Sequence, residues 1–425
     1  MTTAIIANEP VLRIQRSEGL TAFPEDLFEH CDTLELLDLS NNKISRLPEN
    51  FGDFKALKIL FLSNNHFTEF PKVVANCPNL TMIGFKSNQI TTIPEDAFPK
   101  QLQWLILTDN KIAALPKSIG ECFKLQKCAL AGNQLTHLPD EMAQCRNLEL
   151  LRISANQLQE LPQWLVELPR LAWLAFSGNP CTAKIPVQEK IATIAWEELA
   201  VLEQLGEGAS GIISKAIWKN QTVAIKVFKG EVTSDGYPED ELATCLATGN
   251  HPNLVSLLSE ITGHPENKKG IVMTLITPEF SNLGMPPNFD TCTRDVFPSH
   301  QQLNLNQALT ILQNMAHAAH HLHSKGILHG DFYAHNILYQ KDGASYLGDF
   351  GAASCYDKES DLAIQIERIE VRAFGYLMED LLAQIEEEAN PLFKTLRNLK
   401  EDCLSEDYKN RPDFEAILSV LKGIL

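Results

Sequence analysis

Leucine residues recur through the first part of the chain with a period of 22 or 23 residues. Each opens the pattern L-x-x-L-x-L-x-x-N-x-L or a close variant, as in residues 34–44. In six of the seven copies, an apolar residue followed by Pro comes after this pattern and starts the convex side of the repeat. Each copy can bury its leucines only against its neighbours, so the pattern predicts one stacked array. The opening residues are Leu34, Leu57, Leu80, Leu102, Leu125, Leu148 and Leu171.

These copies resemble leucine-rich repeats, whose short strands line a concave sheet. An Asn follows each strand at a fixed offset, and we expect this column to stack as a ladder that satisfies backbone groups of the turns. Its members are Asn42, Asn65, Asn88, Asn110, Asn133, Asn156 and Asn179. An incomplete first turn over residues 20–24 would cap the array.

The third position of each repeat faces outward from the concave sheet and is apolar in six of the seven repeats. Because exposed apolar patches commonly mark interaction surfaces, we predict a protein-binding groove centred on Trp104. Ile59, Met82 and Trp173 would line the groove beside it, and a protein substrate or regulator would bind there. The alternative interpretation is that the rest of the chain, or a second copy of it, already covers this face.

The second part of the chain carries residues typical of phosphoryl transfer. Asp331 is followed five residues later by Asn336, and Asp349-Phe350-Gly351 comes next. Asp331 can accept a proton from an attacking hydroxyl, while Asn336 and Asp349 can hold magnesium ions against the phosphates. A short loop between two strands would place all three on one rim of a cleft. The spacing therefore favours the use of ATP and Mg²⁺.

A glycine-rich run, Gly206-Glu207-Gly208-Ala209-Ser210-Gly211, precedes these residues. It lies between two apolar segments, which predicts a strand, a turn and a second strand, whereas a dinucleotide-binding fold needs a helix after the turn. Glycines let such a hairpin lie close over phosphate oxygens, where a Cβ would intrude. Lys226 follows at the end of Val-Ala-Ile-Lys, and Glu241 falls in a helical pattern over residues 238–248.

In this order the motifs resemble those of the eukaryotic-type protein kinase family, over residues 195–425. The resemblance implies that Asp331 is the catalytic base, with Asn336 and Asp349 as metal ligands. It implies that Lys226 holds the α- and β-phosphates and that Glu241 orients Lys226, with Glu239 as the competing glutamate. The implied nucleotide pocket consists of Gly206, Gly208, Gly211, Ile213, Ala224, Lys226, Met273, Thr274, Ile276 and Leu338.

Departures from the family pattern affect the expected regulation and substrate. Gly330 stands where the family has an Arg that binds a phosphate on the activation loop, so we expect activity without loop phosphorylation. Glu370 replaces a helix Asp, and only 20 residues separate it from Asp349. The segment that docks peptides in the family would therefore be short. Glu359 in this segment is a candidate partner for Arg411.

Two alternatives to a protein kinase stay open. His-Gly-Asp is also the loop of small-molecule kinases of the aminoglycoside and choline phosphotransferase type, and the short segment suits them. A pseudokinase scaffold is the other alternative. The presence of Lys226, Asp331 and Asp349 favours an enzyme over that scaffold.

Composition limits the partners and the compartment. A formal charge of −18 over 425 residues would repel nucleic acid and anionic membranes. No stretch approaches the roughly 18 apolar residues that a membrane span needs, and the N-terminus lacks the pattern of a signal peptide. Four of the ten cysteines recur at an inward position of the repeats, which suits buried free thiols in a reducing compartment. We therefore expect a cytoplasmic protein.

Taken together, the patterns predict an α/β leucine-rich-repeat solenoid over residues 1–183 and an α+β bilobal protein-kinase-like domain over residues 195–425. A linker over residues 184–194 would join them without a flexible tether, so an intramolecular contact between repeats and kinase domain is compatible with it. The expected function is ATP-dependent phosphorylation of protein hydroxyl groups, with the repeats as the recruitment module.

Overall fold

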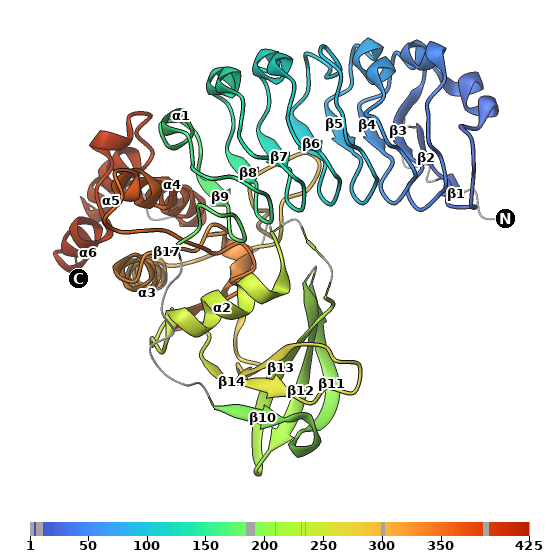
Figure 1. The fold of residues 1–425 in the computed structure, drawn as a ribbon. Helices are drawn as coiled ribbons and strands as arrows, with labels where there is room; N and C mark the ends of the chain where they lie inside the picture. The colour runs from blue at the N-terminus through green and yellow to red at the C-terminus, as the bar shows by residue number, and fades with distance from the viewer. Residues whose placement is uncertain are drawn as a thin grey trace. The chain divides into compact units, whose positions relative to one another are not determined.

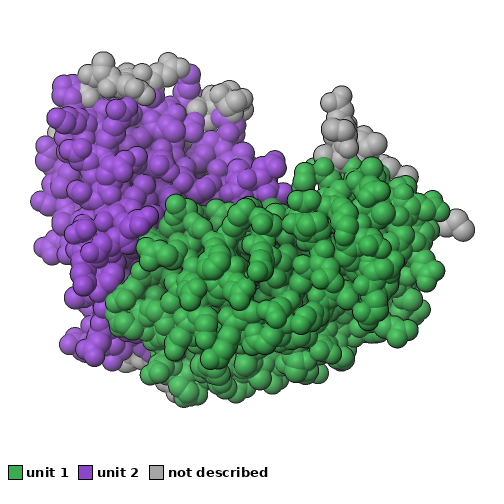
Figure 2. All heavy atoms as spheres, turned by 90° about the horizontal axis from the view of Figure 1, so that it is seen from above, with its two compact units in different colours: residues 1–170, 179–181 green, residues 171–178, 182–425 purple. Residues whose placement is uncertain are grey.

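The structure is a computed structural model that describes residues 4–5, 12–183, 192–208, 210–230, 232–233, 235–298, 302–385 and 391–424. The chain forms two compact units (Figure 2). The first contains Met1–Arg170 and Asn179–Cys181, and the second contains Leu171–Gly178 and Thr182–Leu425. Most of the predicted linker, residues 184–191, lies outside the described residues.

Short parallel strands form the sheet of the first unit (Figure 1). β1 pairs antiparallel with β2, and from β2 to β8 each strand is parallel to the next. The register puts the third position of successive repeats in one row across the sheet, from Leu36 to Leu150. The strands are β1 (Ala4–Ile5), β2 (Leu12–Gln15), β3 (Leu34–Asp38), β4 (Ile59–Phe61), β5 (Met82–Gly84), β6 (Trp104–Ile106), β7 (Lys127–Ala129) and β8 (Leu150–Arg152).

Short helical segments of one or two turns return the chain along the other side of the repeats. Each of these segments begins directly after a Pro, whose fixed φ near −70° suits the position before a helix. The segments are η1 (Glu25–His30), η2 (Glu49–Asp53), η3 (Lys72–Asn76), η4 (Lys117–Glu121), η5 (Asp140–Gln144) and α1 (Gln163–Val166).

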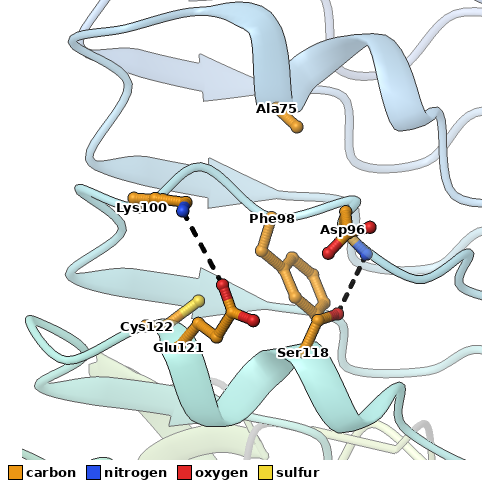
Figure 3. Close-up of a pocket in the computed structure, with 7 residues that line it drawn as sticks. All are labelled: Ala75, Asp96, Phe98, Lys100, Ser118, Glu121 and Cys122. Atoms are coloured by element: carbon orange, nitrogen blue, oxygen red, sulfur yellow. Dashed lines mark hydrogen bonds and ion pairs between the residues drawn. The ribbon is translucent and has the colours of Figure 1, made fainter.

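The repeat that opens at Leu80 has 22 residues instead of 23, and its described residues form no helical turn. A cavity of about 190 Å³ opens there between η3 and η4 (Figure 3). Phe98 and Cys122 are buried in its wall, and Lys100 lies 3.8 Å from Glu121 at its rim. This shorter repeat thus has turns and a bend where the other repeats have a helical segment, and a gap lies in the stack there.

The predicted asparagine ladder is confirmed. All seven Asn side chains of the column are buried. Asn110 is representative: its Oδ1 accepts the Ile90 N–H at 3.0 Å, and its Nδ2 donates to the carbonyls of Phe85 at 2.9 Å and Leu107 at 3.0 Å. Each Asn therefore joins its own turn to the preceding repeat and satisfies backbone groups that no water can reach.

We expect Asn110→Ala to lower the free energy of unfolding by about 2 kcal/mol or more. Each buried backbone group left without a partner costs about 1–3 kcal/mol, and this change removes several partners. Asn79→Ala is the matched control, because Asn79 is exposed and donates only to the Lys55 carbonyl at the surface. Urea titration of both variants measures the difference, and equal shifts of the two midpoints would contradict the role of the ladder.

The second unit has two lobes. The smaller lobe has a six-stranded sheet in the order β10-β14-β15-β13-β12-β11, with the helix α2 (Figure 1). Its core holds β-branched side chains such as Ile194, Val223, Ile225 and Val272, which suit a packed sheet. The elements are β10 (Thr193–Ala195), η6 (Trp196–Glu198), β11 (Ala200–Glu207), β12 (Gly211–Trp218), β13 (Gln221–Phe228), α2 (Pro238–Thr248), β14 (Leu257–Thr262) and β15 (Gly270–Thr274).

The larger lobe is mainly helical, with two small antiparallel sheets, β16-β18-β19 and β17-β20. The helices α3 and α4 each run for 20 residues. The amphipathic α3 buries one side in the core of the lobe, whereas α4 is buried on all sides over residues 369–378. The elements are β16 (Ser281–Asn282), α3 (Leu305–Ser324), β17 (Ile327–Leu328), η7 (Ala334–Asn336), β18 (Ile337–Tyr339), β19 (Ser345–Leu347), β20 (Ser354–Cys355), α4 (Ala363–Leu382), α5 (Pro391–Cys403), η8 (Tyr408–Asn410) and α6 (Phe414–Lys422).

The strand of the seventh repeat, β9 (Trp173–Ala175), belongs to the second unit. The prediction that Trp173 lines an open groove is therefore wrong: its side chain is 1% exposed and stacks on Tyr333 at 4.2 Å between ring centres. Met82 is buried as well, at 5% exposure. Of the four predicted contact residues, Ile59 and Trp104 keep partly exposed side chains.

All ten cysteines lie within the described residues, and each carries a free thiol. Burial raises the pKa of the Cys77, Cys122 and Cys145 thiols to about 12, so these thiols stay protonated near neutral pH. None of the helices in the described ranges combines the length and the apolar character that crossing a membrane requires.

Candidate active site

A cavity of about 440 Å³ lies between the lobes of the second unit. Its size is in the usual range for small-molecule sites. All ten residues of the predicted nucleotide pocket line it, from both lobes, together with Glu241, Asn336 and Asp349. Asp331 is not part of the wall, but it is hydrogen-bonded to Asn336, which is.

The glycine-rich run forms the turn between β11 and β12, which pair antiparallel as the sequence predicted. The Gly208 N–H donates to the Gly211 carbonyl at 2.9 Å and closes the hairpin. A Cβ at Gly211 would lie 2.7 Å from the Val227 carbonyl oxygen, so packing alone excludes a larger residue there. A Cβ at Gly206 or Gly208 would meet nothing within 4 Å, which leaves open space for a ligand to approach the backbone.

Lys226 on β13 forms a buried ion pair with Glu241 on α2. The Lys226 side chain is 9% exposed and that of Glu241 is 3% exposed. Burial opposes the charge on Lys226, but the carboxylates of Glu241 and Asp349 outweigh it and raise the pKa of the ammonium group. Glu239, the competing glutamate, is exposed and pairs with Lys269 at 3.4 Å. The geometry therefore places Glu241, and not Glu239, beside Lys226.

The loop that carries Asp331 follows the short strand β17 and is tied down by hydrogen bonds on both sides. His329 is fully buried, and its Nε2 lies 3.0 Å from the carbonyl oxygen of Gly348, the residue before Asp349. This contact joins the loop to the segment that carries Asp349. The Asn336 Nδ2 donates to the Asp331 Oδ2 at 2.8 Å and to the Asp331 carbonyl at 2.9 Å. Asn336 thereby fixes the Asp331 carboxylate, while its own amide oxygen keeps acceptor capacity.

Asp349 has a φ of +54°, a left-handed conformation that is uncommon for residues other than Gly. Such a conformation is often held at functional sites by the surrounding structure. Its Oδ1 accepts the Gly351 N–H at 3.2 Å, and its side chain faces the cavity beside Asn336. Carboxylate and amide oxygens are hard ligands that suit Mg²⁺ when phosphate oxygens complete the shell. The residues present therefore fit a magnesium nucleotide.

Glu370 on α4 anchors the start of the same loop. Its side chain is 1% exposed; Oε1 accepts the Gly330 N–H at 2.9 Å, and Oε2 lies 2.8 Å from the His323 Nε2. Arg411, for which Glu359 was a candidate partner, donates instead to backbone carbonyls, including those of Ser405 and Arg368. Glu359 is exposed, whereas Arg411 is 2% exposed, so a surface carboxylate and a buried guanidinium do not form the suggested ion pair.

Protein-family models match residues in both units of the chain. The model of the protein kinase domain matches residues 199–368, and that of the leucine rich repeat matches residues 11–67 and 123–180. This chain carries leucine-rich repeats and a protein kinase domain.

Curated relatives are protein kinases that match part of the chain. A probable serine/threonine-protein kinase of Dictyostelium discoideum is 24% identical over 54% of this chain and 28% of its own length. The serine/threonine-protein kinase PITSLRE of Drosophila melanogaster is 30% identical over 38% of this chain and 16% of its own. Cyclin-dependent kinase 11.1 of Caenorhabditis elegans is 27% identical over 38% of this chain and 22% of its own length. The chain thus spans less than a third of the length of these relatives.

The kinase domain has a further pair at its cavity that sequence reasoning did not identify. His335 lines the cavity; its Nδ1 lies 2.7 Å from the Asp295 Oδ1, and its backbone N–H donates to the Asp295 Oδ2 at 2.9 Å. Burial opposes protonation, but the hydrogen bond and charge of Asp295 outweigh it and raise the pKa of His335. Asp295 comes from a stretch that looks like a surface loop, and no local motif indicates a partner 40 residues away.

We expect Glu241→Ala to lower the free energy of unfolding of the kinase domain by about 3–5 kcal/mol, because it leaves the Lys226 charge buried without its partner. Glu239→Ala should change it by less than about 0.5 kcal/mol, as is usual for an exposed side chain. Thermal melting of the two variants beside the parent chain checks this. A similar loss in both variants would show that burial of the pair is not what matters.

Proposed function

We propose that the kinase domain transfers the γ-phosphate of ATP to hydroxyl groups of proteins. The observation that carries the proposal is the arrangement around one cavity: Asp331 is fixed by Asn336, Asp349 faces the same space, and Lys226 is held charged by Glu241. Protein kinases use these residue types in these places for phosphoryl transfer.

Each of these side chains has a role that follows from its charge and position. The ammonium group of Lys226 binds the α- and β-phosphates, and Glu241 keeps it from swinging away. Asn336 and Asp349 hold Mg²⁺, which when bound neutralises charge on the phosphates. The Asp331 carboxylate orients the acceptor hydroxyl and accepts its proton. Ile213, Ala224 and Leu338 provide apolar surface for the adenine ring.

The acceptor that we propose is a serine or threonine of a protein, which the names of the relatives support. The repeats would recruit this protein or a regulator through the concave face around Trp104 and Ile59, and Trp173 is no longer part of that proposal. The free thiols of the chain suit a reducing compartment such as the cytoplasm.

A small-molecule acceptor is the second candidate. The observation that favours it is the short path after Asp349: the helix α4 already begins at Ala363, so little chain is left to form a peptide-docking platform. The acceptor panel described next separates the two candidates, because it contains both protein and small-molecule hydroxyl groups.

The test is to incubate the purified chain with ATP, Mg²⁺ and a panel of proteins, peptides, aminoglycosides and choline. We expect phosphate on protein serine or threonine, and a loss of about 10²–10⁴-fold in rate for Asp331→Ala, as is typical for removal of a general base. Nucleotide affinity should be unchanged, because Asp331 does not line the cavity.

Asp342→Ala is the matched control, since Asp342 is an exposed aspartate in the turn between β18 and β19. It should transfer phosphate as fast as the parent chain. Phosphate on a small molecule alone would move the assignment to the second candidate. Tight nucleotide binding with no transfer to any acceptor would contradict both and indicate a pseudokinase scaffold.

A further inference from the structure

The segment Leu171–Gly178, which we name the β9 segment, contacts the kinase domain at three places around the catalytic loop. It comes from the seventh leucine-rich repeat in sequence but is part of the same compact unit as the kinase domain. The three contacts involve a side chain, a backbone carbonyl and two backbone N–H groups, and each of them reaches a residue close to Asp331 or to Asp349.

The first contact is made by Trp173. Its indole Nε1 donates to the Phe332 carbonyl at 3.3 Å. Its ring lies 4.2 Å from the Tyr333 ring at an interplanar angle of 7°, and 5.3 Å from the Tyr376 ring of α4 at 16°. Phe332 and Tyr333 directly follow Asp331 in the chain. The indole is therefore fixed between the catalytic loop and α4, where stacked rings contribute about 0.5–1.5 kcal/mol beyond their buried area.

The second contact explains the glycine before Asp331. Gly330 has a φ of +73°, and a Cβ there would lie 2.6 Å from the carbonyl oxygens of both Leu174 and Ala352. The backbone of the β9 segment thus occupies the space into which a side chain at this position would extend. The Arg that the kinase family carries here would not fit, so Gly330 and the position of the β9 segment depend on each other.

The third contact lies beyond Asp-Phe-Gly, in the short stretch before α4. The Oγ of Ser354 on β20 accepts the N–H groups of Phe176 at 2.8 Å and Ser177 at 3.1 Å. The Ala183 N–H donates to the Cys355 carbonyl at 3.1 Å. Ser354 is fully buried, so this stretch is held by backbone groups of the β9 segment and the residues just after it.

We propose that Trp173 is a positioning residue for Asp331, and that the β9 segment holds the catalytic loop of this kinase domain in its working conformation. In the family, an Arg and a phosphate on the activation loop hold the catalytic loop. Here a segment of the chain's own repeats holds it permanently. A 1 Å displacement of a catalytic group can cost about 10²-fold in rate. The consequence for activity rests on the proposed function, whereas the consequence for loop conformation does not.

The experiment uses the full chain with Trp173→Ala, Trp173→Phe and the control Trp164→Ala, which removes a half-buried tryptophan from α1. Hydrogen exchange of the amides in residues 330–336 and 354–355 is measured first. We expect exchange at least about tenfold faster in Trp173→Ala, an intermediate value in Trp173→Phe, which keeps a ring but loses the N–H, and parent values in the control.

Steady-state kinetics of the same variants provide the second measurement. Trp173→Ala should lower kcat by about 10²-fold and leave the KM for ATP within about threefold of the parent value, because Trp173 does not line the nucleotide cavity. A merely structural role would move both parameters together or neither of them.

Several outcomes decide the proposal. Parent-like exchange in folded Trp173→Ala overturns it, whatever the activity. If Trp173→Ala fails to fold, Trp173→Phe decides: faster loop exchange supports the proposal and unchanged exchange overturns it. If the parent chain transfers no phosphate to any acceptor, the proposed function fails, while the exchange data still decide the role of Trp173.

Discussion

One buried carboxylate, that of Glu370, sets the position of the catalytic loop. A buried charge is costly unless hydrogen bonds compensate it, and Glu370 has the Gly330 N–H on one oxygen and His323 on the other. The helix α4 thereby fixes the backbone one residue before Asp331. Since Asn336 then holds the Asp331 carboxylate, the geometry of the proposed catalytic base follows from this anchor.

The loop is held from its other side by the β9 segment, so that it lies between an acidic helix residue and a strand of a leucine-rich repeat. The two supports are themselves connected, because Trp173 stacks on Tyr376 of α4, which is about 1.7 turns after Glu370. Glycine at position 330 allows both supports of the loop. It leaves room for the Leu174 carbonyl of the β9 segment, and its N–H donates to Glu370. The kinase domain therefore has its loop supported without a phosphate.

The sequence predicted those parts of the molecule that depend on local or repeated patterns. The asparagine ladder follows from a strict period, and Lys226, Asn336 and Asp349 follow from short motifs whose spacing the chemistry requires. Long-range contacts were not predictable in this way. Trp173 was predicted to line an open groove, but its partner Phe332 is 159 residues away and the period carries no information about it. Asp295 and His335 are a similar case, because neither belongs to a motif that names the other.

The most direct test of this account is a time course of phosphate transfer by a chain that carries no phosphate. The chain is treated with phosphatase, its unmodified mass is verified, and transfer is followed from the first seconds after ATP and Mg²⁺ are added. We expect the full rate from the first time point, because the β9 segment and Glu370 already support the loop. A lag that disappears after preincubation with ATP would contradict it, since the loop would then need phosphorylation to become active.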